Sequence, residues 1–195
     1  MVTAIPKRKG ASGVLKAEDF RGITVNCVMS KIFEHCLLNF FADTKTSSRQ
    51  FGFKKGLSCQ HAIHSVKKII NMFNGKGCTV SIGVVDLSKA FDKVNFFALL
   101  SVLIKNNVSK YVVGLLENWF LKSSAIVKWD SSKSETFKLS SGVRQGGVLS
   151  PLLFSLYVDS VLKSLENSKL GCYIGDVCCN SFMYAVELIL LLAPV

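Results

Sequence analysis

Two acidic side chains lie at the ends of predicted strands, where carboxylates could bind a ligand or a metal ion. Asp86 ends the apolar, β-branched stretch "CTVSIGVVD", and Glu187 lies at the bend of the last stretch, "SFMYAVELILLLAPV". A carboxylate at the end of a buried strand is costly unless it has a partner such as a cation, and ligand and metal sites gather at such edges of sheets. Taken alone, Asp86 is better explained as a helix N-cap or a surface residue.

The last stretch predicts a strand, a tight turn and a second strand. Such a hairpin brings a carboxylate at its tip beside Asp86, and Glu187 is the one charged residue that the tip offers. Two or three clustered carboxylates are what a two-metal phosphoryl-transfer site needs, because its ions lie about 3.5–4 Å apart. The pair Asp86 and Glu187 is therefore a candidate catalytic pair.

A third candidate is the glycine-rich loop "GVRQGGVLSP". Gly142, Gly146 and Gly147 let the backbone approach a ligand closely, and Arg144 and Gln145 supply hydrogen-bond donors. The loop lacks the Lys-Ser/Thr ending of a Walker phosphate loop. Because ordinary turns have similar sequences, this motif alone is only moderately specific.

The elements that must position these residues follow from periodicity and punctuation. Apolar residues at helical spacing predict amphipathic helices, including one from Met29 whose stripe is Ile32, Phe33, Cys36, Leu37 and Phe40. Further helices are expected after Ser58, over 95–106 and 109–122, and from Pro151. Segment 5–25 predicts a loop or a hairpin, and segment 124–142 predicts a β-hairpin with a polar tip.

Charge is distributed unevenly along a chain whose net charge is +11. Residues 1–80 hold 13 Lys and Arg against 4 Asp and Glu, whereas residues 81–195 hold 11 against 9. A basic first half suggests a polyanionic partner, most often nucleic acid. A merely soluble basic surface explains the charge equally well.

The cysteines and apolar runs exclude several classes of protein. Seven cysteines without paired spacing indicate reduced, structural thiols in an intracellular protein, in the nucleus or the cytoplasm, rather than a zinc site. His61 and His64 lie three apart on a helix but have no third ligand, which favours a solvated face. No run approaches the roughly 20 apolar residues of a membrane span, so no membrane association is expected.

Five segments, in order, resemble the reverse transcriptase domain of non-LTR retrotransposons. They are "IPK…DFRGITV…SKIFEHCL", "QFGFKKGLSCQHAI", "VDLSKAFDKV", "SSGVRQGGVLSPLLFSLYVDSV" and "FMYAVELILLLAP". The third and fifth look like the two catalytic motifs of that family. The resemblance covers nearly the whole chain, so residues 1–195 are interpreted as a partial reverse transcriptase domain.

The resemblance implies an α/β (α+β) right-hand polymerase, in which a palm with an antiparallel sheet and helices carries a fingers lobe. The break "NGKG" separates a fingers-like part, residues 1–77, from a palm-like part, residues 78–195. The family's activity is RNA-directed DNA polymerisation with two Mg²⁺ ions. An RNA template, a DNA primer and a dNTP are the implied partners.

The resemblance also implies roles for single residues. Asp86 would bind both magnesium ions, the Leu87 carbonyl would add a ligand, and Glu187 would take part in metal binding and catalysis. Phe91 would lie under the sugar and discriminate against ribonucleotides. The remaining nucleotide- and template-binding positions would be Lys7 (or Lys9), Arg21, Gln145 and Gly146.

The tip departs from the family's pattern, which reads aromatic-Ala-Asp-Asp where this chain has Tyr184, Ala185, Val186 and Glu187. The isopropyl group of Val186 cannot coordinate Mg²⁺, a hard cation that takes oxygen ligands. Glu187 is one methylene longer than Asp, and a small misplacement can cost about a hundredfold in rate. A loss of about four orders of magnitude corresponds to roughly 5.5 kcal/mol of transition-state stabilisation.

The resemblance ends just past the hairpin, which implies that the family's thumb is absent from this chain. We therefore expect exposed apolar surface, such as the "LILLL" strand, and self-association through it. The principal interpretation is an inactive or very weakly active reverse transcriptase domain. Three alternatives stay open: a non-catalytic nucleic-acid-binding remnant, a fragment without molecular function, and a working enzyme that uses Asp86 and Glu187 alone.

Overall fold

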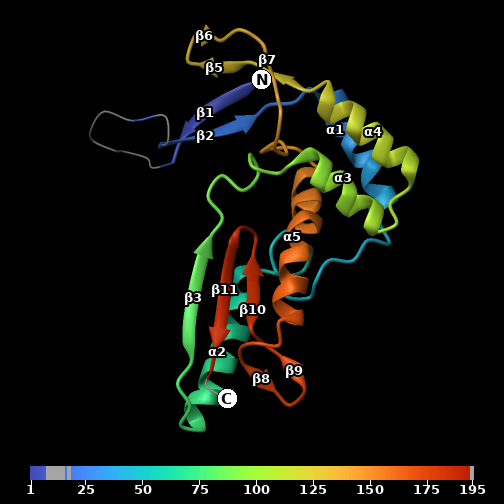
Figure 1. Ribbon diagram of the computed structural model, residues 1–195. Helices are drawn as coiled ribbons and strands as arrows, with labels where there is room; N and C mark the ends of the chain where they lie inside the picture. Colours follow the sequence, from blue (N-terminus) through green and yellow to red (C-terminus); the bar gives the residue numbers. More distant parts are fainter. Residues whose placement is uncertain (8–15, 17–18, 194–195) are drawn as a thin grey trace. The chain divides into compact units, whose positions relative to one another are not determined.

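The structure is a computed structural model that describes residues 1–7, 16 and 19–193, so Lys9 lies outside the described residues (Figure 1). The chain forms two compact units, each built from segments that are distant in the sequence. The first unit combines Met1–Thr44 with Phe91–Phe154, and the second combines Lys45–Ala90 with Ser155–Val195. The expected division into fingers-like and palm-like parts at residue 77 stays a prediction.

A four-stranded sheet in the order β2-β1-β5-β6 organises the first unit. Strand β1 pairs antiparallel with β2 and parallel with β5, and β5 pairs antiparallel with β6. A separate two-stranded ladder joins β4 to β7, so the hairpin expected over 124–142 is confirmed. The strands are β1 (Val2–Pro6), β2 (Phe20–Thr24), β4 (Ser124–Ala125), β5 (Val127–Trp129), β6 (Ser132–Lys133) and β7 (Phe137–Lys138).

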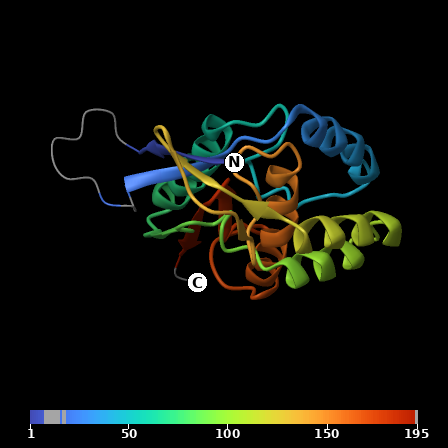
Figure 2. The ribbon, with the colours of Figure 1, turned by 90° about the horizontal axis from the view of Figure 1, so that it is seen from above.

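The helices of the first unit are α1 (Val28–Leu38), a short 3-10 helix (Asn39–Phe41), α3 (Phe96–Lys105) and α4 (Lys110–Leu121). Figures 1 and 2 show α3 and α4 side by side, in light green and yellow-green. Leu99 and Leu103 of α3 and Leu116 of α4 are wholly buried. The Asn95 side chain accepts a hydrogen bond from the Ala98 amide and so caps α3 at its start.

Helix α1 begins at Val28, next to the expected start at Met29, and ends at Leu38, before the last residue of the expected stripe, Phe40. The prediction of its buried face was wrong. Met29, Ile32 and Phe33 of the expected stripe are 72%, 50% and 40% exposed, and of the apolar residues of α1 only Leu37 is buried. The buried face instead holds Glu34, which is 3% exposed. The reason is a polar contact with a distant loop, which spacing along the helix does not encode.

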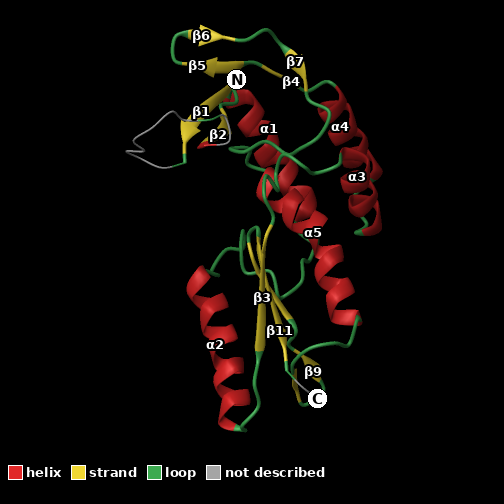
Figure 3. Cartoon of the chain, turned by 60° about the vertical axis from the view of Figure 1, so that its left-hand side comes forward, coloured by secondary structure: helices red, strands yellow, loops and turns green. Residues whose placement is uncertain are grey.

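The second unit is a three-stranded antiparallel sheet, in the order β10-β11-β3, with the helix α2 alongside it (Figure 3). Val66 and Ile69 of α2 pack with Cys172 and Leu191 in one apolar cluster. The small hairpin β8–β9 and most of α5 complete the unit. The elements are α2 (Cys59–Gly75), β3 (Ser81–Asp86), α5 (Ser150–Asn167), β8 (Tyr173–Ile174), β9 (Val177–Cys178), β10 (Ser181–Tyr184) and β11 (Glu187–Leu192).

The expectation that the "LILLL" strand is the exposed one was wrong, because that strand, β11, lies in the middle of its sheet. Leu188 and Leu191 are buried, whereas all six residues of the edge strand β3 are exposed. The predicted helix cap at Ser58 is confirmed, since Ser58 is the N-cap of α2 and forms a capping box with His61, whose Nδ1 accepts from the Ser58 amide at 3.1 Å. Among the described helices, none is long and apolar enough to cross a membrane.

Candidate active site

The sheet of the second unit brings the two predicted carboxylates together. Asp86, the last residue of β3, lies directly opposite Glu187, the first residue of β11. Opposed residues of antiparallel strands have Cβ atoms about 4.5–5.5 Å apart. The Leu87 amide then donates to the Val186 carbonyl at 3.0 Å, which extends the pairing around the tip. The predicted placement of the acid beside Asp86 is confirmed.

The tip itself is a two-residue turn, Ala185-Val186, between the paired residues Tyr184 and Glu187. Asp86 and Glu187 are exposed and Val186 is half-buried. Among the described residues, no group of three or more His, Cys, Asp or Glu side chains could hold a metal ion. The residues present therefore do not fit the two-metal site that the family resemblance implies.

The glycine-rich loop belongs to the first unit, where it lies against the segment that follows Phe91. Gly142 donates to the Val94 carbonyl at 2.8 Å, and Val143 donates to the Phe91 carbonyl at 2.7 Å. Gly142 has φ +92°, and a Cβ there would meet the Asp92 backbone at 2.9–3.1 Å. Glycine is therefore required at this position by conformation and by space.

Gln145 contacts Asp92 and Thr24, and Gly146 lies against Thr24. The Gln145 side chain donates to Asp92 Oδ1 at 3.2 Å, and its carbonyl accepts from the Thr24 amide at 2.7 Å. Gly146 has φ +106°, and a Cβ there would lie 2.8 Å from the Thr24 carbonyl. The loop thus joins the end of β2 to the segment after Phe91 through backbone contacts.

Phe91, the expected sugar-facing residue, is half-buried and stacks on Phe154 of α5. The ring centroids are 4.9 Å apart and the planes differ by 13°. This stacking holds the Phe91 ring in place. It does not show what the opposite face of the ring contacts. The role of Phe91 towards a sugar stays a prediction.

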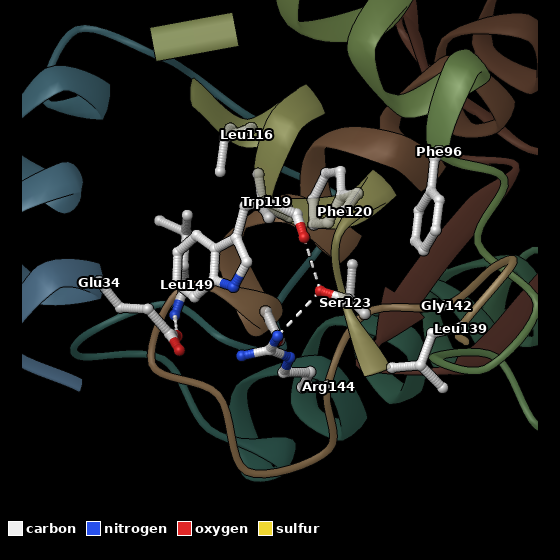
Figure 4. A pocket seen from close by; sticks show the side chains of 13 residues that line it. Glu34, Phe96, Leu116, Trp119, Phe120, Ser123, Leu139, Gly142, Arg144 and Leu149 are labelled. Atoms are coloured by element: carbon white, nitrogen blue, oxygen red, sulfur yellow. Dashed lines mark hydrogen bonds between the residues drawn. The ribbon is translucent and has the colours of Figure 1, made fainter. Parts of the chain in front are cut away.

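Arg144 was expected to offer donors to a ligand, but its side chain contacts its own unit (Figure 4). Its guanidinium donates to Ser123 Oγ at 2.9 Å and lies 5.2 Å from the ring centroid of Trp119. Burial lowers the pKa of Arg144, while nearby Glu34 raises it. The Arg144 side chain therefore anchors the loop to Ser123 and Trp119 and does not extend into solvent as a ligand donor.

Glu34 is a second brace that the sequence did not single out. Its Oε2 accepts from the Leu149 amide at 2.8 Å, and its Oε1 accepts from Asn26 at 3.4 Å. The adjoining cavity in Figure 4 holds about 30 Å³, enough for a water molecule but far too little for a nucleotide. Glu34 lies outside the apolar stripe predicted for α1, so the spacing of apolar residues gave no signal for it.

The remaining predicted residues lie on the β1–β2 hairpin. Arg21, in β2, is exposed and pairs in register with Ile5. Lys7 follows β1 directly, and its amide donates to the Asp19 carbonyl at 2.8 Å. The first unit therefore holds Lys7, Arg21, Phe91, Gln145 and Gly146, and the second holds Asp86, Leu87, Val186 and Glu187.

Comparison with known families and proteins gives a consistent result. The pattern of the family described as "Reverse transcriptase (RNA-dependent DNA polymerase)" matches residues 5–185. The chain is 29% identical to the retrovirus-related Pol polyprotein from type-2 retrotransposable element R2DM of Drosophila melanogaster, over 95% of this chain and 17% of that protein. It is 28% identical to the probable RNA-directed DNA polymerase from transposon X-element of the same species, over 89% of this chain and 19% of that protein. The chain thus spans less than a fifth of the length of these relatives.

Solved structures with a similar fold are telomerases. Apo telomerase from Candida tropicalis gives a TM-score of 0.55 at 15% identity, over 84% of this chain and 34% of that one. Telomerase from Candida albicans in complex with a fragment of telomeric RNA gives 0.55 at 11% identity, over 84% and 30%. At these identities the likeness shows the fold alone, and it confirms the expected right-hand polymerase fold.

Proposed function

This chain belongs to the reverse transcriptase (RNA-dependent DNA polymerase) family, and from that premise we propose that it is the polymerase domain of a retroelement whose catalytic tip is broken. RNA-directed DNA polymerisation by this chain is then absent or very weak. Its substrates in the active family form are an RNA template, a DNA primer and a dNTP.

The register of the tip carries the proposal. Asp86 and Glu187 are opposed on neighbouring strands, as a catalytic pair requires, but Val186 occupies the turn position next to Glu187. A family site with Asp at that position offers a hard oxygen ligand where this chain offers a branched hydrocarbon. Two exposed carboxylates alone leave the two-metal chemistry without one of its main ligands.

The glycine-rich loop of the first unit supports the same assignment. The contacts of Gly142, Gln145 and Gly146 give the loop a defined backbone, and Phe91 is fixed by its stack on Phe154. We infer that Gln145 and Gly146 line the nucleotide and template, and that Lys7 and Arg21 bind its triphosphate. The lesion then lies in the metal ligands and not in the loop.

Primer extension on an RNA template with Mg²⁺ tests this proposal. The unaltered chain is compared with the double variant Val186→Asp, Glu187→Asp, which we expect to extend at least about 10⁴-fold faster. Val177→Asp is the matched control, because Val177 is 63% exposed on β9 and a carboxylate there adds charge without a metal ligand. Equal rates for the unaltered and the double-variant chain would contradict the proposal.

A second candidate function is nucleic-acid binding without catalysis, and the sheet of the first unit favours it. Ile5 pairs with Arg21, Thr3 pairs with Lys128, and Lys128 pairs with Lys133, which places the three cations on one face. We call Arg21, Lys128 and Lys133 the cationic strip. Like charges directly opposite each other are destabilising, and a bound polyanion removes that cost.

Binding of a single-stranded RNA of 20 nucleotides, measured by fluorescence anisotropy over a range of salt, tests the second function. Each phosphate contact on a single strand contributes about −0.7 to the slope of log K against log salt. Lys128→Gln with Lys133→Gln should therefore flatten the slope by about 1.4. The same change at Lys67 and Lys68, exposed on α2, is the control and should have a smaller effect. An unchanged slope in the strip variant would exclude this surface.

A further inference from the structure

Gln50 is the most deeply buried amide of the second unit, and it contacts the catalytic turn. Its side chain is 0% exposed. Its Oε1 accepts from the Ala185 amide at 3.1 Å and from the Gly52 amide at 2.8 Å. Its Nε2 donates to the Ala185 carbonyl at 3.2 Å. One side chain therefore pairs both backbone polar groups of Ala185.

Ala185 needs such support because of its conformation. It is the first residue of the two-residue turn and has φ +57°. A left-handed backbone is unfavourable for a residue with a Cβ, which is why turns usually place Gly there. A conformation of this kind persists when the surrounding structure holds it in place. The Gln50 amide does so through its bonds to the Ala185 backbone.

The segment around Gln50 is itself fixed along β10. The Phe51 amide donates to the Met183 carbonyl at 2.8 Å, and the Met183 amide donates to the Arg49 carbonyl at 2.8 Å. The Arg49 guanidinium bonds to Asn180 at 2.7 Å and to Glu166 at 3.3 Å. The segment thus runs along one side of β10, and β11 pairs with the other side.

Gly52 closes the same contact from the other direction. A Cβ on Gly52 would lie 2.1 Å from the Ala185 nitrogen and 2.6 Å from its Cα. No side chain fits there unless the turn moves. Gln50 and Gly52 together therefore enclose the backbone of the turn that carries Val186 and leads into Glu187.

We propose that Gln50 is a positioning residue, which fixes the backbone of the catalytic turn independently of the side chains at 186 and 187. The consequence for catalysis rests on the proposed function. If the turn is set from outside, a carboxylate restored at position 186 starts from a backbone that is already in place. We call the contact of the Gln50 side chain with the Ala185 backbone the clamp. The clamp needs no metal and exists in the unaltered chain.

Hydrogen exchange of the Ala185 amide, followed by NMR in the unaltered chain, tests the clamp. In Gln50→Met, which keeps the length of the side chain but removes its amide, Ala185 should exchange at least tenfold faster. The amides of Leu188 and Leu191 in β11 should keep their protection, since their ladder bonds remain. Gln60→Met, on the exposed side of α2, is the matched control and should change neither.

Two results would overturn the inference. One is unchanged exchange at Ala185, and the other is an equal loss of protection at Ala185 and throughout β11, which indicates a general structural role. If Gln50→Met does not fold, Gln50→Asn replaces it, because it keeps an uncharged amide but draws it back from the Ala185 backbone by one methylene. Its expected change is about threefold, confined to the turn.

A second readout separates this inference from the proposed function. Mn²⁺ alone is titrated by EPR into the Val186→Asp, Glu187→Asp chain with and without Gln50→Met. The clamp predicts at least tenfold weaker binding with Gln50→Met, and no change with Gln60→Met. If the doubly substituted chain binds no Mn²⁺, the proposed function fails, while the exchange at Ala185 still decides the clamp.

Discussion

The glycine-rich loop of the first unit and the turn Ala185-Val186 of the second unit are supported in the same way. They differ in the side chains that they carry. Each is held by one buried acceptor from a preceding segment, Glu34 for the loop and Gln50 for the turn. Each also requires glycine where backbone approaches backbone, at Gly146 and at Gly52. Under the proposed function, the lesion lies in the side chains of Val186 and Glu187 at the turn and not in the loop.

This difference separates two kinds of constraint. The supports of a site are needed for folding, because a buried polar group without its partner costs about 1–3 kcal/mol. Exposed carboxylates such as those of Asp86 and Glu187 contribute little to folding, since surface substitutions usually change stability by less than about 0.5 kcal/mol. A chain released from catalysis can therefore lose its ligands and keep their supports.

The largest expected effect sharpens the comparison at Asp86. In the Val186→Asp, Glu187→Asp chain, Asp86→Ala should lower the rate of primer extension by about 10⁴-fold, roughly 5.5 kcal/mol. Asp176→Ala, at an exposed aspartate between β8 and β9, is the control and should lower it far less. Extension that survives Asp86→Ala would show that the activity does not arise from the predicted pair.

The next effect concerns the supports themselves. Gly52→Ala and Gly146→Ala should each lower the free energy of unfolding by about 3 kcal/mol, because a new Cβ meets fixed backbone in both regions. Gly56→Ala, which has φ +81° but open space around it, should cost only about 1 kcal/mol. Urea denaturation measures all three, and tolerance at either supporting position would break the comparison.

A smaller effect is expected at the buried carboxylate of the loop. Glu34→Leu leaves the Leu149 amide without its acceptor and should lower the free energy of unfolding by about 2 kcal/mol. Glu117→Leu, at an exposed position of α4, should change it by less than about 0.5 kcal/mol. The two variants are compared by thermal unfolding, and equal values would remove Glu34 from the supports.

The smallest effect concerns the edge of the second unit's sheet. The exposed edge strand β3 presents Ile82 and Val84, 52% and 68% exposed, and unpaired edges invite pairing with a second copy. Ile82→Lys with Val84→Lys should reduce self-association in sedimentation velocity. Ile63→Lys, on the exposed part of α2, is the control and should leave it unchanged. A chain that is monomeric before substitution would refute the expected self-association.

The sequence by itself determined the local elements and the residues of the hairpin tip. The strand into Asp86, the hairpin around Ala185-Val186 and the helices α3, α4 and α5 follow from patterns that span only a few residues. The two-residue turn fixes only the register of β10 with β11, so the opposition of Asp86 and Glu187 depends on the tertiary pairing of β11 with β3.

Only the tertiary structure decided which polar side chains are supports. Glu34 reaches Leu149 across 115 residues, Gln50 reaches Ala185 across 135, and Arg144 turns to Ser123 instead of outwards. The exposed stripe of α1 has the same origin. Spacing along a chain shows which side chains share a face, but the energy that buries one face comes from partners that are distant in the sequence.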